Sequence, residues 1–479
     1  MGTGRSMVRL TGVTIRNFKN VVYGNLSFPS IKEYKASVLG LYGQNGSGKT
    51  AMIDAIDFLK YILRGMAIPN RFADYINVNS DTAKLSFEFR ITLPQGEFPA
   101  VYEVDYQKSG NIEAQNEETA IQGKGAYRVT IIGETMKVFT ISPNKKGRMG
   151  RLIDTNTEKL FSPKPKMDML IGNEKKKKND LLIAKKIAAL SSRSFVFSRE
   201  LQETIRVRRE EELTEEENQA LAFYAAIFEA LVNYGNRELF VVNTANSGLI
   251  SLNAQPLSFK YEEKNHGAIG TVILPLDEPA VVPKKMYGDV QKIVQNMNIV
   301  LRQLIPGLTI GLKGLGTQIT EEGEKGIRFQ LMSEKNGKEI ALKYESEGIK
   351  KIVSILQLLI VVYNQPSFTV AIDELDSGVF EYLLGELLRI ISEKGKGQLL
   401  FTSHNLRPLE TLDKGFVAFT TVNPKNRYIR MNNVKENHNL RDFYYRDILL
   451  GEQNEIVYES TNNAEIAFAF REAGDVVGS

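Results

Sequence analysis

One short segment, residues 43–50, constrains the fold of this chain more than any other. It reads Gly-Gln-Asn-Gly-Ser-Gly-Lys-Thr, follows an apolar run at residues 38–42 and opens a helical pattern at residues 51–63. Glycines at its first and sixth positions let the backbone wrap a phosphate chain. N–H groups and the positive end of the following helix then face the phosphate oxygens. This strand, loop and helix pattern predicts a P-loop.

The same segment assigns chemical roles to its residues. Lys49 is expected to reach the β- and γ-phosphates of a nucleoside triphosphate, and the Thr50 hydroxyl is expected to ligate Mg²⁺. The alternative is a glycine-rich turn with an incidental lysine, and motifs elsewhere in the chain decide between the two. On the P-loop interpretation all eight residues bind ATP: Gly43, Gln44, Asn45, Gly46, Ser47, Gly48, Lys49 and Thr50.

Two later apolar strands end in polar residues that fit the same chemistry. Residues 368–372 lead into Asp373 and Glu374, where Asp373 is expected to hold Mg²⁺ through its water shell and Glu374 to polarise the attacking water. Residues 398–403 lead into His404, which is placed to sense the γ-phosphate. Taken alone, each pattern also fits a buried strand with polar residues at its exposed end. We predict Lys49, Glu374 and His404 as the catalytic residues, and Thr50 and Asp373 as the metal ligands.

A third motif lies at the start of a predicted helix. Ser346 and Gly348 precede a segment whose apolar residues, from Ile349 to Ile360, recur with helical spacing. A hydroxyl and free N–H groups at a positive helix N-terminus bind phosphate, whereas a simple helix cap needs no ligand. Both interpretations stay open from the residues alone.

Composition excludes several classes of protein. The chain has 479 residues, no cysteine and three histidines, which rules out disulfides and thiolate metal sites and argues against a histidine-rich metal centre. Its longest apolar run is too short to span a membrane, and no signal peptide is seen. We therefore expect a cytoplasmic protein without a membrane partner. Residues 1–6 are interpreted as a non-native remnant ahead of a natural start at Met7.

The rest of the chain indicates a divided head with an insertion. Residues 7–142 are assigned to the N-terminal half of the head, residues 143–305 to a basic segment and helical insertion, and residues 306–479 to the C-terminal half and a tail. Strand patterns at 8–18, 23–28, 84–92, 100–106, 127–132 and 136–141 predict an antiparallel lobe. Further strands are expected at 239–242, 248–252, 308–312, 326–332 and 339–344, with Gly311, Gly314 and Gly316 as turns or bends. Helices are expected at 220–234, after a capping box at 214–217, and at 288–304.

The segment from Pro143 to Leu190 concentrates positive charge. It contains 13 basic and 5 acidic residues, a net charge of +8, whereas the whole chain has +4. Such a segment is either a solvated, partly mobile loop or a surface for an anionic partner. We expect a surface for DNA or a protein to include Lys145, Lys146, Arg148, Arg151, Lys175, Lys176, Lys177 and Lys178.

The ordered motifs at residues 43–50, 346–348, 372–376 and 402–405 resemble those of the ATP-binding-cassette (ABC) type ATPases of the SMC, RecF and OLD group. The chain looks closest to the short RloA-like AAA proteins of bacterial anti-phage defence loci, with good coverage at residues 8–63 and 342–409. The resemblance implies an α/β fold, an ABC-type P-loop NTPase head with a mixed core sheet, an antiparallel β lobe and a helical, basic insertion. It also implies two heads closing on ATP. Lys49, Thr50, Asp373, Glu374 and His404 would act in one chain, and Ser346, Gly348 and Asp376 would contact the opposite site.

Three departures limit that resemblance. The signature is not Leu-Ser-Gly-Gly-Gln, Gln202 is only a candidate for the glutamine loop, and no coiled coil separates the halves of the head. The 70 residues after Leu409 show no new set of spaced carboxylates, so no nuclease domain is expected in this chain.

The predicted function is ATP hydrolysis by a homodimer or higher homo-oligomer that regulates a separate effector, a nuclease, in antiviral defence. The alternatives are a RecF-like DNA-binding clamp in repair, the nucleotide-binding component of a transporter, and an ATP-gated scaffold with little turnover.

Overall fold

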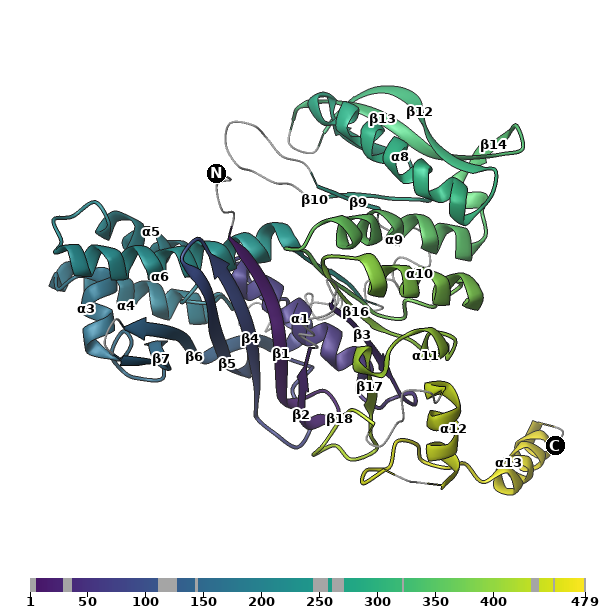
Figure 1. Cartoon of the computed structure of the whole chain (residues 1–479), viewed down its shortest axis with the longest axis horizontal. Helices are drawn as coiled ribbons and strands as arrows, with labels where there is room; N and C mark the ends of the chain where they lie inside the picture. Colours follow the sequence, from purple (N-terminus) through teal and green to yellow (C-terminus); the bar gives the residue numbers. More distant parts are fainter. Residues whose placement is uncertain are drawn as a thin grey trace.

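A computed structural model describes residues 6–28, 37–110, 127–142, 145–243, 257–260, 271–320, 323–431, 439–450 and 453–477. Two six-stranded sheets form the body, with the segment from α3 (Lys164–Ile171) to α6 (Glu215–Asn233) at one end and a smaller α/β unit beside the core (Figure 1). The predicted α/β class, with a mixed core sheet and an antiparallel lobe, is confirmed.

The core sheet joins strands from distant parts of the chain. Its order is β18-β17-β3-β16-β15-β8, with β18 antiparallel and the other pairs parallel. The central strands are buried along their whole length, as expected for parallel strands covered on both faces. The strands are β3 (Ser37–Tyr42), β8 (Leu239–Val242), β15 (Thr369–Ile372), β16 (Gln398–Thr402), β17 (Val417–Thr420) and β18 (Tyr428–Ile429).

The two faces of this sheet pack into different cores because side chains alternate along each strand. Leu39, Ala371 and Leu400 join the core that contains α1 (Lys49–Leu63) and the lobe. Val38, Val370 and Leu399 join the core of α9 (Glu347–Asn364) and α10 (Glu381–Lys394). The P-loop strand therefore lies between two hydrophobic layers.

The lobe is an antiparallel sheet in the order β2-β1-β4-β5-β6-β7. Burial alternates along β4, so one face packs on the core and the other meets solvent. Residues 127–132 and 136–141, predicted as two strands, form the single strand β6, which pairs with β5 across a register shift. The strands are β1 (Met7–Phe18), β2 (Val21–Ser27), β4 (Thr82–Leu93), β5 (Gly96–Gly110), β6 (Tyr127–Ser142) and β7 (Lys145–Asp154).

One side chain joins the lobe to the core sheet. The buried amide of Gln398 accepts from the Leu10 N–H at 2.9 Å and donates to the Leu10 carbonyl at 2.9 Å. It thus pairs with β1 as a neighbouring peptide would. The Thr369 hydroxyl also donates to Gln398 Oε1, at 3.0 Å, which holds the amide in that orientation.

The basic segment is folded, so the loop interpretation is wrong for its described residues. Because β7 pairs with β6, the expected boundary after residue 142 falls within a hairpin of the lobe. The capping box at Thr214 is confirmed at the start of α6. The helices of this end are α3 (Lys164–Ile171), α4 (Lys175–Leu190), α5 (Arg199–Arg208) and α6 (Glu215–Asn233).

A small α/β unit spans the expected boundary at residue 305. Its sheet, β11-β13-β12 with β14 beside β13, is covered by α8 (Lys284–Leu304). Val290, Val294, Met297 and Leu301 form the buried stripe of α8, which confirms the predicted helix. Gly314 and Gly316 mark a β-bulge inside one strand rather than turns between strands. The strands are β11 (Ala280–Pro283), β12 (Leu308–Ile319), β13 (Lys325–Lys335) and β14 (Lys338–Ala341).

Two predicted strands are shorter than expected or lie outside the described residues. The expected strand at 339–344 ends at Ala341, and residues 342–344 form a 3₁₀ turn. The expected strand at 248–252 lies outside the described residues. The strands β9 (Leu257–Lys260) and β10 (Thr271–Leu274) pair with each other.

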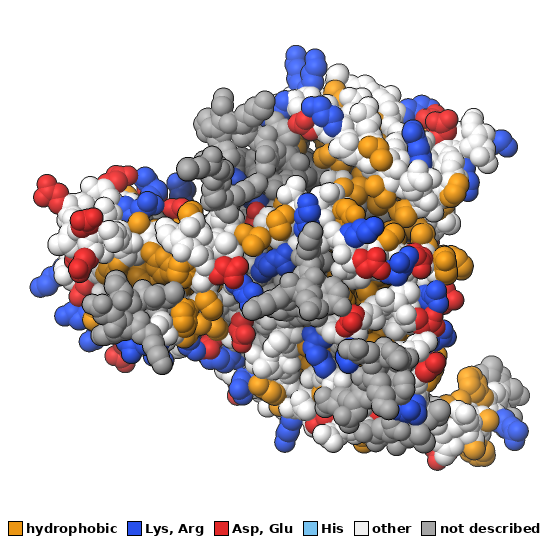
Figure 2. Space-filling view, in the orientation of Figure 1, with side chains coloured by type: hydrophobic (Ala, Val, Ile, Leu, Met, Phe, Trp, Pro, Cys, Tyr) orange, Lys and Arg blue, Asp and Glu red, His pale blue; other side chains and the backbone are white. Residues whose placement is uncertain are grey.

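The tail completes the core and then leaves it. After β18 the chain forms α12 (Leu440–Leu450), and α13 (Asn463–Val477) projects from the body with hydrophobic side chains on its surface (Figure 2). No helix within the described residues combines the length and apolar character of a membrane span.

Candidate nucleotide site

The P-loop connects β3 to α1 through three glycines with positive φ. These are Gly43 (151°), Gly46 (73°) and Gly48 (93°). A Cβ on Gly43 would overlap the Thr420 hydroxyl, so this position also requires glycine for close packing. The predicted loop therefore has the backbone shape that lets its N–H groups turn inward.

Lys49 lies at the start of α1 and is buried. Its ammonium donates to the Gly43 carbonyl at 2.8 Å and to the Gln44 carbonyl at 2.9 Å. Burial lowers the pKa of Lys49 to about 8, and the charges of Asp373, Glu374 and Asp376 act in the opposite direction. The lysine thus lies close enough to the acids that follow β15 for their charges to raise its pKa.

Thr402, at the end of β16, organises these acids. Its hydroxyl donates to the buried carboxylate of Asp373 and accepts from the Glu374 N–H at 2.8 Å. Glu374 has φ of 48°, a conformation that costs energy for a residue with a side chain. The hydrogen bond to Thr402 helps to hold Glu374 in this conformation, which aims its side chain differently from that of Asp373.

Asp376 organises the loop after β16 within its own chain. Its Oδ2 accepts from the backbone N–H groups of His404, at 3.0 Å, and Asn405, at 2.8 Å. Its Oδ1 is buried and has no hydrogen-bond partner among the described residues. The Asp376 carboxylate thus orients the His404 loop of its own chain. Its predicted contact with the nucleotide site of a second copy stays a prediction.

These elements border one cleft of about 490 Å³. It brings together Lys49 and Thr50 from the P-loop helix, Asp373 and Glu374 just after β15, and His404 just after β16. The other residues that line it are Lys19, Asn20, Asn45, Gly46, Gly48, Ala51 and Thr402.

Ser346 and Gly348 lie outside the set of residues that line this cleft. Ser346 is exposed and caps α9, where its hydroxyl accepts from the Ile349 N–H at 3.4 Å. A Cβ on Gly348 would overlap the carbonyl oxygen of Gly378, just beyond Asp376. The first turn of α9 therefore packs backbone against backbone on the turn that carries Glu374.

Lys351, also on α9, was not predicted from the sequence. It is buried, which lowers its pKa, while the charges of Glu374, Asp376 and Asp373 oppose that shift. A cation thus approaches the acids from the signature helix as well as from the P-loop. The Lys350-Lys351 pair did not predict a site residue, because pairs of charged residues near a helix N-terminus are common on solvent-exposed faces.

Residues from the tail brace the P-loop and were also missed. The Tyr428 hydroxyl donates to the Gly48 carbonyl at 2.9 Å, and the Glu459 N–H donates to Gln44 Oε1 at 2.7 Å. From the N-terminal hairpin, the Asn20 amide donates to the Gly46 carbonyl. Lys19 pairs with the buried Asp54 and lies 4.1 Å from the ring centre of Tyr75. No motif marks these residues, because each contact joins segments far apart in the chain.

Gln202, the candidate for a glutamine loop, does not line the cleft. Its amide donates to the Val196 carbonyl at 2.8 Å, beside the start of α5. The structure gives it a local role in that turn.

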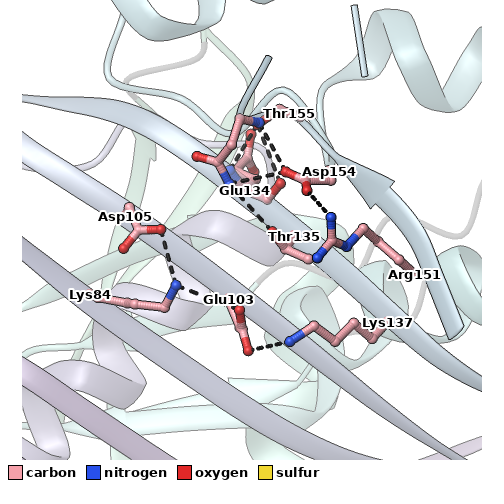
Figure 3. Close-up of polar contacts among 10 residues, drawn as sticks. Lys84, Glu103, Asp105, Glu134, Thr135, Lys137, Arg151, Asp154 and Thr155 are labelled. Carbon is pink, nitrogen blue, oxygen red and sulfur yellow. Dashed lines mark hydrogen bonds and ion pairs between the residues drawn. The ribbon is translucent and has the colours of Figure 1, made fainter. Parts of the chain in front are cut away.

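Part of the predicted basic surface is already paired. Arg151 contacts Asp154 at 2.7 Å (Figure 3), Lys177 contacts Glu211 at 2.6 Å and Lys178 contacts Asp168 at 2.6 Å. Arg148, Lys175 and Lys176 are exposed, and the side chains of Lys145 and Lys146 lie outside the described part of the structure.

Comparisons with known proteins agree with these motifs. Residues 13–234 match the family model of an AAA domain. DNA replication and repair protein RecF of Shewanella oneidensis is 30% identical over 138 residues, which cover 29% of this chain and 33% of RecF. SbcC, a component of the nuclease SbcCD of Clostridium acetobutylicum, is 26% identical over 183 residues, covering 37% of this chain and 15% of that protein. The chain thus spans a third or less of the length of these curated relatives.

Solved structures give only a distant likeness. The SMC head domain from Thermotoga maritima matches with a TM-score of 0.36 and 15% identity, covering 88% of this chain and 99% of that chain. The recombination mediator protein RecF with ATP matches with a TM-score of 0.32 and 12% identity, covering 83% of this chain and 94% of that chain.

The sheet topology and the cleft together give this chain the fold of an ABC-type P-loop NTPase head. Within that class, the chain is similar in part to RecF and to SbcC. The finer RloA-like assignment stays a prediction.

Proposed function

We propose that this protein binds ATP with Mg²⁺ and hydrolyses it to ADP and phosphate. The observation that carries the proposal is the convergence of three strand ends, those of β3, β15 and β16, on one cleft. Their polar residues are far apart in the sequence and have complementary roles in phosphoryl transfer. Parallel strands bring such residues together at one edge of a sheet.

Each of the predicted residues that line the cleft has a defined role in this reaction. Lys49 exchanges its contacts with the Gly43 and Gln44 carbonyls for the β- and γ-phosphates. Thr50 and Asp373 would hold Mg²⁺, which neutralises phosphate charge when it is bound. Glu374 accepts a hydrogen bond from the attacking water and orients it, while His404 contacts the γ-phosphate.

We further propose that two copies share each site. Ser346 is exposed at a helix N-terminus, a position suited to phosphate binding, but it does not line the cleft of its own chain. The phosphates that it contacts would therefore belong to a nucleotide bound by another copy. The exposed side chains of Tyr344 and Phe380 lie next to this region in sequence and would be covered by the same contact. ATP bound between two heads would then stabilise the dimer, and hydrolysis would weaken it.

A mixing experiment tests the shared site. Glu374→Gln should retain ATP binding and lose roughly 10²-fold or more of hydrolysis, since a positioned base supplies about 10² to 10⁴. Ser346→Arg should bind ATP and fail to form a productive pair. Mixed heterodimers contain one site with an intact Glu374 and an intact partner serine, so ATP turnover should reappear. Wild-type hydrolysis by Glu374→Gln would refute the catalytic assignment. Silent mixtures with proven heterodimers would refute the shared site.

The cellular role that we propose is control of a separately encoded effector, a nuclease, in defence against phage or foreign DNA. The resemblance of the motif set to RloA-like proteins supports this role. Cells carrying the locus should lose protection in a phage plaque assay when Glu374→Gln replaces the wild type. Protection that is unchanged by this variant would separate the ATPase from defence.

A RecF-like DNA clamp is the second candidate, favoured by the partial similarity to RecF. The exposed Arg148, Lys175 and Lys176 would contact phosphates. Each such contact on duplex DNA lowers log affinity by about 0.9 per log unit of salt. Because Lys177 and Lys178 are engaged in ion pairs, glutamine at all four positions 175–178 should flatten the salt slope by about two rather than four. An unchanged slope would exclude Lys175 and Lys176 as DNA contacts.

A further inference from the structure

Two helices at opposite ends of the molecule expose apolar side chains that the nucleotide cleft does not use. One is α4, in the basic segment, and the other is α13, in the tail (Figure 1). Neither belongs to the motifs assigned to ATP hydrolysis. Both helices expose apolar side chains, and α4 is rich in lysine whereas α13 contains more acidic than basic residues.

The outer side of α4 carries an aliphatic stripe. Ile183, Ile187 and Leu190 are 57%, 58% and 60% exposed. Spacings of four and three residues place them on one side of the helix, over a length of about 10 Å at 1.5 Å per residue. The inner side of α4 packs on the body through Leu181 and Ala188. A surface helix normally turns polar residues outward, so this stripe is an unfilled contact surface.

Positive charge borders the stripe. Helix α4 contains six lysines and one aspartate. Lys176 lies one heptad before Ile183, and Lys186 lies beside Ile187. Both lysines are exposed, and neither forms an ion pair with another described residue. A partner for this surface should therefore combine apolar side chains with acidic ones.

The tail helix α13 has that composition. Its described side chains, residues 463–474, are all exposed. Ile466 and Phe470 are four residues apart and share one side of the helix, while Phe468 lies towards the other; Phe470 is 77% exposed and Phe468 66%. The helix contains three acids and one arginine. Figure 2 shows its hydrophobic surface standing away from the body.

A short tether prevents α13 from reaching α4 of its own chain. The backbone of Glu459 is hydrogen-bonded to Gln44 at the P-loop, and α13 begins at Asn463. Glu459 and Asn463 are four residues apart, so the segment between them spans at most about 14 Å when fully extended. A compact chain of 479 residues has a radius of gyration of about 23 Å, and the two helices lie at opposite ends of the body. Only a second copy can bring these surfaces together.

We propose that α13 of one copy docks on the Ile183–Ile187–Leu190 stripe of α4 in another copy. The apolar sides would meet, with Lys176 and Lys186 beside acids such as Glu465 and Glu472. Such a contact is head-to-tail: each copy donates one helix and accepts another, so copies form a ring or an open chain. It is independent of nucleotide and differs from the ATP-dependent face-to-face contact of the proposed function.

Sedimentation of the full-length chain without nucleotide tests this proposal. The wild type should associate, and Ile187→Glu or Phe470→Glu should each weaken association at least tenfold. Both changes are at exposed positions, so circular dichroism and ATPase activity should stay at wild-type values. Ile299→Glu is a matched control, because Ile299 is also exposed but lies on α8. It should associate like the wild type.

Mixing the two defective chains gives a sharper result. The Ile187→Glu chain keeps its tail helix and the Phe470→Glu chain keeps its stripe, so an equimolar mixture should form dimers and nothing larger. Lys186→Glu should weaken association, and adding Glu472→Lys should restore part of it. Three outcomes would overturn the proposal. The wild type could remain monomeric at 100-fold above working concentration, or the mixtures could stay monomeric. Alternatively, Phe470→Glu could abolish association while Ile187→Glu does not. The last outcome would assign α13 to a different protein or surface.

Discussion

The P-loop and the turn at Ser346 are both helix N-termini, yet their surroundings differ. The P-loop receives hydrogen bonds from Asn20, Tyr428 and Glu459, and Thr420 packs against it. The Ser346 side chain is exposed, and Gly348 two residues later lies against the Gly378 carbonyl with no room for a Cβ. The P-loop terminus is therefore braced by other segments of its own chain, whereas the Ser346 hydroxyl, which we propose contacts the nucleotide of a second copy, is exposed.

This difference indicates how the energy of binding is divided. A braced loop loses little freedom when a ligand arrives, so it provides affinity. The first turn of α9 packs on the turn that carries Glu374. If a second copy contacts this part of α9, the contact could therefore shift the position of Glu374. Substitutions in each turn should separate these two roles.

The largest effect is expected from Gly43→Ala. Overlap with Thr420 and an unfavourable backbone conformation each cost about 1–3 kcal/mol, so ATP affinity should fall at least about 30-fold. Gly46→Ala is the matched control, because its new Cβ meets open space and only the left-handed backbone, about 1–2 kcal/mol, is penalised. Calorimetric titration with ATP measures both. Equal losses would show that packing against Thr420 does not shape the loop.

Gly348→Ala should have an intermediate effect, on turnover rather than affinity. The added Cβ overlaps the Gly378 carbonyl and displaces α9 from the turn that carries Glu374, at a cost of about 1–3 kcal/mol. ATP turnover should fall about 5- to 150-fold while the Kd for ATP stays within about twofold, since the P-loop is untouched. Glu347→Ala, one residue earlier and exposed, should change neither. A large rise in Kd for Gly348→Ala would contradict the division of roles.

The smallest effect is expected from Tyr428→Phe. Loss of one hydrogen bond to the Gly48 carbonyl, about 1 kcal/mol, should weaken ATP binding about fivefold. Tyr445→Phe, in an exposed position of the same tail, should leave affinity unchanged. If both variants bind ATP like the wild type, the brace from the tail does not contribute to affinity.

The sequence predicted the parts of the site that are contiguous. Residues 43–50 and the strand ends at Asp373 and His404 carry local patterns, and parallel pairing brings them to one edge. It also predicted the lobe and α9. It divided β6 in two at residues 133–135, which lie within the strand beside a register shift.

What the sequence missed depends on distant pairing. Tyr428 and Gln398 act on backbone groups of segments hundreds of residues away, and no spacing rule links them. The lysine run at 175–178 was considered as one unit, but two of its members contact acids on other elements. Only the fold decides which charges remain available.

The order of strands around β3 has a consequence for synthesis of the protein. Both neighbours of the P-loop strand, β16 and β17, come from the last fifth of the chain, as does the amide of Gln398 that pairs with Leu10. Until the ribosome has made them, β3 has two unpaired edges and the hydrophobic face of α1 is incompletely covered. Such long-range pairing folds slowly and exposes aggregation-prone surface. We therefore expect the nascent N-terminal half to depend on chaperones until the ribosome has added the strands that enclose the P-loop.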